Sequence, residues 1–454
     1  MKKTTGIIFL IAAALAAFVY FYDLKHTKSN AGADELGLDA SSGTADNSKP
    51  AFAIAAPDIA SLTVERGGAT AMFEQRDGTW YMVQPLATRA DQSVVGAIAS
   101  ELASDGVTRT LSAGAGGLAT YGLNSPSVTL QFAMKNGGKH TLKLGGKDFS
   151  GSSVYALVDG GKDVALMSDT ILTSSDKSVD DFRDPSVLTL DTNDIASFEL
   201  QNESGEIDAT KDASTSSWKI EKPRTVAADG SAIAGLLSTI ATAHVTSFVD
   251  DAPGDLAKYG LTHPAVTFHA QLSGGKSAEL QVGKKDGTNY FARDTAKAFV
   301  FRISDSLYKS LSDKLFDLRD KQLVHVNEDD VTRMEIHGAT ASLACVKDAS
   351  NDWTIEAGGD KKSKPENCSS MWYSIRDVRA QDVYDSPTSA MMSQLGKPAV
   401  RVLLTEKSGR NTEVRISAAS GDSVYARSSD ASPVMKIDKQ ILNELNPSSP
   451  SIHD

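Results

Sequence analysis

The sequence contains few of the residues that build metal centres and nucleophilic sites. It has two cysteines in 454 residues, and its eight histidines are scattered along the chain. No histidine pair has the spacing of a helical zinc motif, and two cysteines without a histidine cluster supply too few ligands for structural zinc. A Gly-x-Ser-x-Gly nucleophile motif and a Walker-type phosphate loop are also missing. We therefore expect no catalytic residues, no metal and no cofactor.

Clusters of positive charge are also lacking. Lysine and arginine total 46 against 58 aspartates and glutamates, which gives a formal net charge of -12. Because an acidic surface repels phosphate backbones, we expect no nucleic-acid partner. Hydrophobic residues make up 41% of the chain, enough to bury real cores in two to four domains.

A strongly apolar stretch without charges lies near the N-terminus, the 17 residues from Gly6 to Tyr22, and it ends in a cluster of three aromatic residues. At about 1.5 Å per residue this stretch is at the short end of what spans a bilayer, and the aromatic residues suit the membrane interface. We expect residues 1–27 to be a cytoplasmic stub and an uncleaved transmembrane helix. The alternative is a signal peptide cut near Ala14-Leu15-Ala16, although the apolar stretch continues past that point.

This anchor predicts a single-pass protein of the bacterial inner membrane, with its C-terminal domains on the periplasmic side. No second apolar stretch exists to bring the chain back. Residues 28–57 are rich in Ser, Ala, Gly, Asp and Asn, so they cannot offset the entropy of ordering and are predicted to form a flexible linker.

Internal repetition is the strongest signal in the chain. The strand-like segment that begins at Pro57-Asp58-Ile59 recurs twice, and its aliphatic residues Ile59, Ile195 and Val331 are 136 residues apart. Repetition at fixed spacing indicates tandem copies of one structural unit. We expect repeat domains at residues 58–193, 194–329 and 330–454.

The landmarks of the repeat are a tryptophan and a Tyr-Gly-Leu turn followed by proline. In the first two copies the turn lies 41 residues after the tryptophan, and in the third copy it is degraded to Leu395-Gly396-Lys397-Pro398. We expect these residues to be structural, with glycine supplying a left-handed conformation. The landmark residues are Trp80, Trp218, Trp353, Tyr121, Gly122, Leu123, Pro126, Tyr259, Gly260, Leu261 and Pro264.

Each copy combines alternating strand patterns with an amphipathic helix and ends in a short helix. Asp91 and Asp229 stand where they would cap the amphipathic helices. Strands joined by hairpins, with helices between blocks of strands, predict an α+β fold: three tandem antiparallel sheet-plus-helix domains behind one transmembrane helix. The repeated joints, Phe182-Arg183-Asp184 and Leu318-Arg319-Asp320, are expected to order the connection between domains.

Two alternatives stay open at this level. Cys345 and Cys368 lie in a predicted strand and the following helix, so they form either a disulfide or two buried free thiols. The repeated tryptophans are either core residues or a row of sugar-stacking platforms, and solvent exposure of Trp80, Trp218 and Trp353 would favour the second.

The anchor, the Trp-x-(Ile/Met)-x-x-Pro strand and the Tyr-Gly-Leu-x-x-Pro turn together resemble the bacterial domain-of-unknown-function family 4340. The similarity covers nearly all of residues 58–454, although the third copy departs at its turn. The resemblance implies a single-anchor envelope protein encoded near ABC-transporter components of the gliding-motility type, with no catalytic residues to carry over.

The resulting hypothesis is a non-enzymatic, membrane-anchored accessory or interaction module of an ABC-transporter-type complex, with a protein partner in the membrane or envelope. The alternative is a periplasmic glycan-binding or glycan-processing protein. A third possibility, a hydrolase with two carboxylates in a deep cleft of one copy, would need those carboxylates about 5–10 Å apart.

Overall fold

The computed structural model describes residues 49–447 except for 115–116, 360–363 and 431–432. Packing within the chain separates two compact units, with the division between Asp184 and Pro185. The predicted anchor and most of the predicted linker lie outside the described residues. Within the described ranges, no helix combines the length and the apolar character that crossing a bilayer requires.

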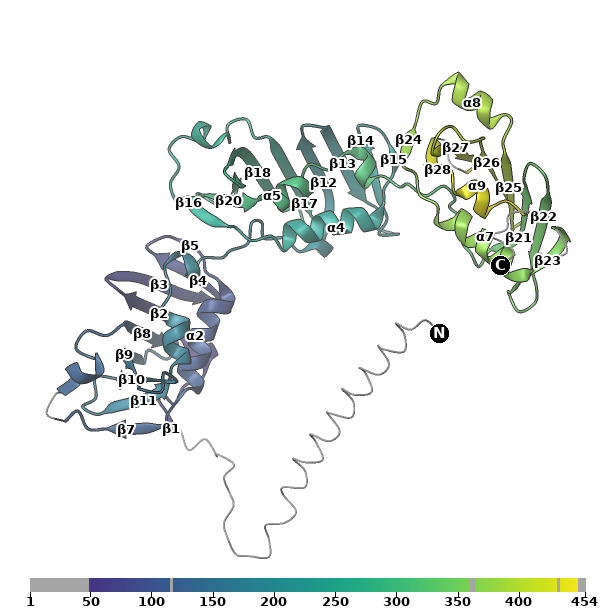
Figure 1. The fold of residues 1–454 in the computed structure, drawn as a ribbon. Helices are drawn as coiled ribbons and strands as arrows, with labels where there is room; N and C mark the ends of the chain where they lie inside the picture. Colours follow the sequence, from purple (N-terminus) through teal and green to yellow (C-terminus); the bar gives the residue numbers. More distant parts are fainter. Residues whose placement is uncertain (1–48, 115–116, 360–363, 431–432, 448–454) are drawn as a thin grey trace, which may run out of the picture. The chain divides into compact units, whose positions relative to one another are not determined.

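A nine-stranded antiparallel sheet forms the body of the first unit (Figure 1), with the order β5-β4-β3-β2-β8-β9-β10-β11-β7. A separate short pair joins β1 to β6. The strands are β1 (Lys49–Pro50), β2 (Ile59–Arg66), β3 (Ala69–Arg76), β4 (Thr79–Gln84), β5 (Thr88–Arg89), β6 (Gly106–Val107), β7 (Arg109–Leu111), β8 (Val128–Met134), β9 (Lys139–Lys147), β10 (Ser153–Val158) and β11 (Val164–Ser168). The helices are η2 (Ala56–Asp58), α2 (Gln92–Ser104), η3 (Gly117–Tyr121), α3 (Thr170–Ser175) and η4 (Asp180–Phe182).

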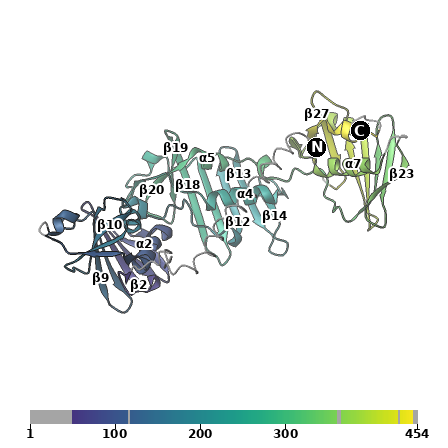
Figure 2. The same cartoon turned by 60° about the horizontal axis from the view of Figure 1, so that its bottom comes forward.

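The second unit begins with another nine-stranded sheet, of order β15-β14-β13-β12-β17-β18-β19-β20-β16. Figure 2 shows its longest helix, α4, lying along the sheet. The strands are β12 (Ile195–Asn202), β13 (Gly205–Lys211), β14 (Trp218–Lys222), β15 (Val226–Ala227), β16 (Ser247–Asp250), β17 (Val266–Leu272), β18 (Ser277–Asp286), β19 (Asn289–Asp294) and β20 (Val300–Ser304). The helices are η5 (Thr192–Asp194), α4 (Gly230–Ala241), η6 (Ala257–Tyr259), α5 (Asp305–Ser310) and α6 (Leu315–Leu318).

An eight-stranded antiparallel sheet completes the second unit, with the order β23-β22-β21-β25-β26-β27-β28-β24. The strands are β21 (Val331–His337), β22 (Ser342–Lys347), β23 (Trp353–Gly358), β24 (Asp382–Tyr384), β25 (Val400–Glu406), β26 (Asn411–Ile416), β27 (Ser423–Ser428) and β28 (Val434–Asp438). The helices are α7 (Pro365–Asp377), α8 (Ser389–Leu395) and α9 (Ile441–Glu444).

The three sheets share one strand order. The first two correspond strand for strand, and the third lacks only the short edge strand that β5 and β15 form in the others. The described chain is thus mostly β with some helices, in three antiparallel sheets of eight or nine strands. The predicted N-caps are confirmed, because the Asp91 and Asp229 carboxylates each accept two backbone N–H bonds from the first turn of α2 and α4.

Each sheet buries one face against its longest helix. The buried helix residues are Val95, Ile98, Ala99 and Leu102 on α2, Ile233, Leu236, Leu237 and Ile240 on α4, and Cys368, Met371, Trp372 and Ile375 on α7. A fully buried Leu or Ile contributes about 1.5–3 kcal/mol, so these apolar stripes, and not helix propensity, hold the helices in place.

Two connecting segments pack with the repeat that follows them. The sequence assigned residues 185–193 to the first repeat, but the Val245 N–H bonds to the Pro185 carbonyl and Val187 is fully buried in the second unit. Leu323 and Val324 likewise belong to the core of the third sheet. These residues precede the repeated strand, and their apolar side chains extend the next core.

Candidate functional site

The repeated tryptophans lie in or beside the cores. Trp80 and Trp353 are 3% and 7% exposed. Trp218 is half-buried, and its ring centroid lies 5.5 Å from that of Phe198. Because a sugar-stacking platform must present its ring face to solvent, the two buried rings are not available for that role.

The two Tyr-Gly-Leu turns have the predicted conformation. Each follows a short 3₁₀ helix, η3 or η6, and both Gly122 and Gly260 have φ +73°. Pro126 and Pro264 each stand two residues before the next strand, β8 or β17. Glycine adopts this left-handed backbone without the steric cost that a Cβ brings.

These turns cover the face of the sheet opposite the long helix. Ala156 belongs to the main core, whereas its neighbour Leu157 packs with Leu123 in a separate cluster. Consecutive strand residues point to opposite faces, so the turn builds a second, smaller core. Edge-to-face ring pairs add to it, Tyr121 with Tyr155 at 4.8 Å in the first repeat and Tyr259 with Phe291 at 5.1 Å in the second, measured between ring centroids.

The turn also requires a glycine that sequence reasoning missed. Gly145 on β9 and Gly283 on β18 each pass directly under the carbonyl of the turn's tyrosine, where an added Cβ would overlap that oxygen. Both lie 23 residues after the glycine of the turn. That equal spacing is the sequence signal that could have revealed the contact.

The third repeat replaces the turn with helix α8, and the glycine requirement disappears with it. Gly396 is right-handed, with φ -68°. Ser417 stands at the position of Gly145 and Gly283, one residue beyond the strand pair Val400–Ile416. Its hydroxyl donates to the Ala418 carbonyl at 2.9 Å and accepts from the Tyr425 N–H at 3.0 Å.

Cys345 and Cys368 form a disulfide, with their sulfur atoms 2.03 Å apart. It joins β22 to α7, and both residues are fully buried. The sequence left open a disulfide or two buried free thiols, and the structure contains the disulfide. The bond fixes the helix of the third repeat on its sheet.

The joint of the second unit is built around Arg319. Its backbone pairs with Ala228 beside helix α4, and its guanidinium donates to both carboxylate oxygens of Asp385 at 2.8 Å. Arg224 also pairs with Asp385, at 3.1 Å. The hydrogen bond from Arg319 holds the pKa of Asp385 below its usual value. The prediction that this motif orders the connection is confirmed here, because the buried Arg319 ties the end of the second repeat to Asp385, which directly follows β24 of the third repeat.

A cavity of about 420 Å³ opens at this joint, lined among others by Arg319, Asp320, His325 and Asp385. The His325 ring bonds to the Asp320 carboxylate, and this hydrogen bond raises the pKa of His325. Burial works to raise the pKa of Asp320, but hydrogen bonds from His325 and the Gln322 N–H outweigh it and leave that pKa lowered. The joint therefore contains an imidazole that carries its proton to higher pH than a free histidine.

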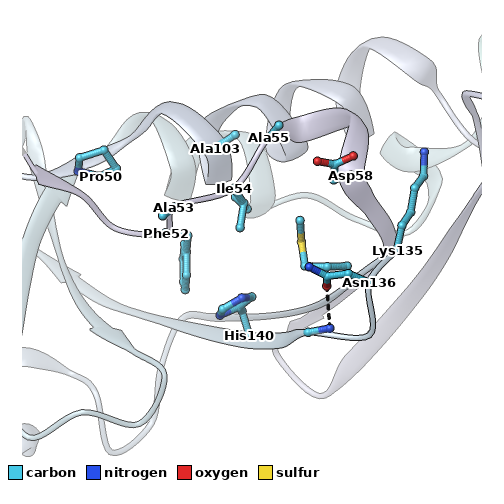
Figure 3. Close-up of a pocket in the computed structure, with 12 residues that line it drawn as sticks. Pro50, Phe52, Ala53, Ile54, Ala55, Asp58, Ala103, Lys135, Asn136 and His140 are labelled. Atoms are coloured by element: carbon cyan, nitrogen blue, oxygen red, sulfur yellow. Dashed lines mark hydrogen bonds between the residues drawn. The ribbon is translucent and has the colours of Figure 1, made fainter.

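The first unit has a larger hollow, of about 580 Å³, where the chain enters the fold (Figure 3). Phe52 is 4% exposed and its ring lies 5.0 Å from Phe132 and 5.2 Å from His140, between centroids. His140 itself bonds to Asp159 at 2.9 Å. The Asp58 and Lys135 side chains stand at the other end of the hollow in Figure 3. We interpret this region as the anchoring point of the linker's last residues on the first sheet.

Among the residues that the structure describes, one group of carboxylates comes close enough together to hold a metal ion. Oxygens of Glu199, Glu206 and Asp208 lie within 4.8 Å of one another. Lys222 already bridges two of them, at 2.9 Å to Glu206 and 2.7 Å to Asp208. The Lys222 ammonium, paired with two of the three carboxylates, supplies positive charge that a cation would otherwise bring.

Comparison with known proteins places the repeats in a family. Residues 80–217 and 218–390 match the family described as a domain of unknown function (DUF4340). The chain belongs to this family. Each DUF4340 segment begins at a repeated tryptophan, Trp80 or Trp218, so the two matches start at equivalent positions of the first two repeats.

Other comparisons add little to the DUF4340 assignment. No curated protein matches the sequence. Among solved structures, the DNA polymerase III subunit beta from Pseudomonas aeruginosa aligns at 6% identity and a TM-score of 0.14, over 84% of this chain and 92% of that chain. No argument rests on a likeness of that size.

Proposed function

We propose that this chain is a non-enzymatic, membrane-anchored envelope protein that serves as an accessory interaction module of an ABC-transporter-type complex. The observation that carries the proposal is the threefold use of one sheet order. Tandem repeats of one scaffold offer extended binding surfaces, whereas one reaction centre does not need three scaffolds.

The disulfide and the family membership support the same proposal. The Cys345–Cys368 disulfide suits an oxidising compartment such as the periplasm. Membership in DUF4340 brings the expectation of a single-anchor envelope protein near transporter components. The glycan-binding alternative is weaker, because its stacking platforms would have to be residues other than the buried Trp80 and Trp353.

Affinity purification from membranes tests the proposal. The full chain, tagged at its C-terminus, is expected to co-purify with subunits of an ABC transporter, identified by mass spectrometry. The matched control joins residues 1–57 to an unrelated periplasmic domain, so that any recovery through the anchor alone is subtracted. Equal recovery of transporter subunits by the two proteins would contradict an interaction through the repeats.

A further inference from the structure

Three arginines of the third repeat stand in one row across its sheet. Arg401 on β25 pairs directly with Arg415 on β26, and Arg415 pairs directly with Arg427 on β27. Their neighbours Val402, Val414 and Ala426 point into the core, so the arginines lie on the outer face. They are 14 and 12 residues apart in the sequence, which is why no basic cluster was visible there.

The other repeats provide an internal comparison for this row. The corresponding positions are Thr129, Lys143 and Leu157 in the first repeat, and Thr267, Gln281 and Arg293 in the second. The scaffold therefore does not require arginine at these places. Like charges directly opposite one another destabilise an antiparallel pair, so a triple arginine row is unfavourable unless an anion offsets it.

The described chain offsets only part of this charge. Glu413 serves two of the arginines, at 3.3 Å from Arg401 and 3.1 Å from Arg415. No carboxylate in the described part of the chain lies within ion-pair distance of Arg427, whose guanidinium instead approaches the Met392 sulfur at 3.8 Å. Three arginines against one paired carboxylate leave the row itself with an excess of two positive charges, in a protein whose net charge is -12.

A groove of about 240 Å³ runs beside the row, between helix α8 and the sheet. Arg415, Arg427 and Glu413 line one side, and Met392, which is 38% exposed, lines the other. This volume is below the roughly 300–1,000 Å³ of cofactor and drug-sized pockets. It suits one or two side chains of a docked segment, an acidic one at the arginines and an apolar one at α8.

We propose that this arginine row, Arg401, Arg415 and Arg427, is a docking site for an acidic peptide segment of a partner protein. The bound carboxylate would pair with Arg427 as Glu413 pairs with the other two, since guanidinium and carboxylate form charge-assisted, often bidentate, hydrogen bonds. The partner's class rests on the proposed function, but the site itself rests on the row, its missing counter-charge and the groove.

The test uses the purified full chain in a non-ionic detergent and a fluorescein-labelled peptide of alternating glutamate and leucine. Fluorescence anisotropy is expected to show binding that weakens as salt rises. Arg427→Gln should weaken the binding about tenfold or more, the loss expected for one charge-assisted pair. Arg293→Gln, at the same register position of the second repeat, is the matched control and should leave binding unchanged.

Four results would overturn the assignment. They are binding of a glutamine-leucine peptide as tight as that of the acidic one, equal weakening by both variants, no binding of the acidic peptide, or tight binding only to vesicles of phosphatidylglycerol. If a peptide of the chain's own residues 33–40 bound more tightly than the probe, the segment that occupies the site would belong to this protein and the proposal of a partner would be wrong. None of these outcomes alters the recovery of transporter subunits by the wild-type chain, so failure here and failure of the proposed function remain distinguishable.

Discussion

The contact between the Tyr-Gly-Leu turn and its underlying glycine predicts that Gly283→Ala is strongly destabilising. Cβ atoms in proteins essentially never come within 3.0 Å of another heavy atom, and the added Cβ would lie inside that limit from the Tyr259 carbonyl oxygen. It would also lie 3.1 Å from the Gly260 carbonyl carbon. The φ of Gly283 is not positive, so alanine brings no backbone strain of its own. The turn must move away from the strand to make room.

The cost follows from what the turn buries. Overpacking a well-packed contact costs about 1–3 kcal/mol, and exposing a buried leucine such as Leu261 costs about 1.5–3 kcal/mol. Because part of the clash relaxes as the turn lifts, the two costs overlap, and we expect a loss of about 2–4 kcal/mol in the unfolding free energy of the second repeat.

Urea unfolding of the full chain, monitored by hydrogen exchange in peptides from residues 247–304, measures this loss. Gly254→Ala is the matched control, because a Cβ there meets nothing within 4 Å and the residue has no positive φ. Exchange protection that changes by less than about 0.5 kcal/mol in Gly283→Ala would refute the reasoning, since surface substitutions fall in that range.

Three further predictions concern the third repeat and the joint. Replacing Cys345 and Cys368 by serine should destabilise the third repeat by about 3 kcal/mol, because the disulfide closes a loop with a sequence separation of 23. Urea unfolding with and without reductant measures this loss, and reductant should have no effect on the serine variant. Arg319→Gln leaves Asp385 without its buried partner and should cost roughly 3 kcal/mol, measured by thermal unfolding, whereas Arg224→Gln, at a half-exposed pair, should cost well under about 1 kcal/mol. The raised pKa of His325 means that its pairing with Asp320 stabilises the folded state fully below about 6.5 and is lost as pH rises through the folded-state pKa. Since the imidazole is partly exposed, the unfolding free energy should fall by only about 0.5 kcal/mol between pH 6 and pH 9 from this pairing. Urea unfolding at the two pH values should show this contribution in the wild-type chain and not in His325→Gln. The same pH dependence in both proteins would contradict the assignment.

Much of the fold was readable from spacing. The recurrence of Ile59, Ile195 and Val331 every 136 residues indicated the tandem copies, and the strand alternation indicated antiparallel sheets. Asp91 and Asp229 were identified as helix caps from their position alone. These features are local or periodic, so neighbouring residues in the chain carry the information.

The sequence by itself determined the repeated sheet, the positions of its helices and the left-handed glycines, because each depends on residues near one another in the chain. Only the tertiary structure decided which residues meet across strands: Gly145 beneath Tyr121, Arg319 against Asp385, and the arginine row of the third sheet. Strand register brings together residues a dozen or more positions apart, and a shift of one residue would send every side chain to the other face. Such meetings cannot be deduced from composition or local pattern.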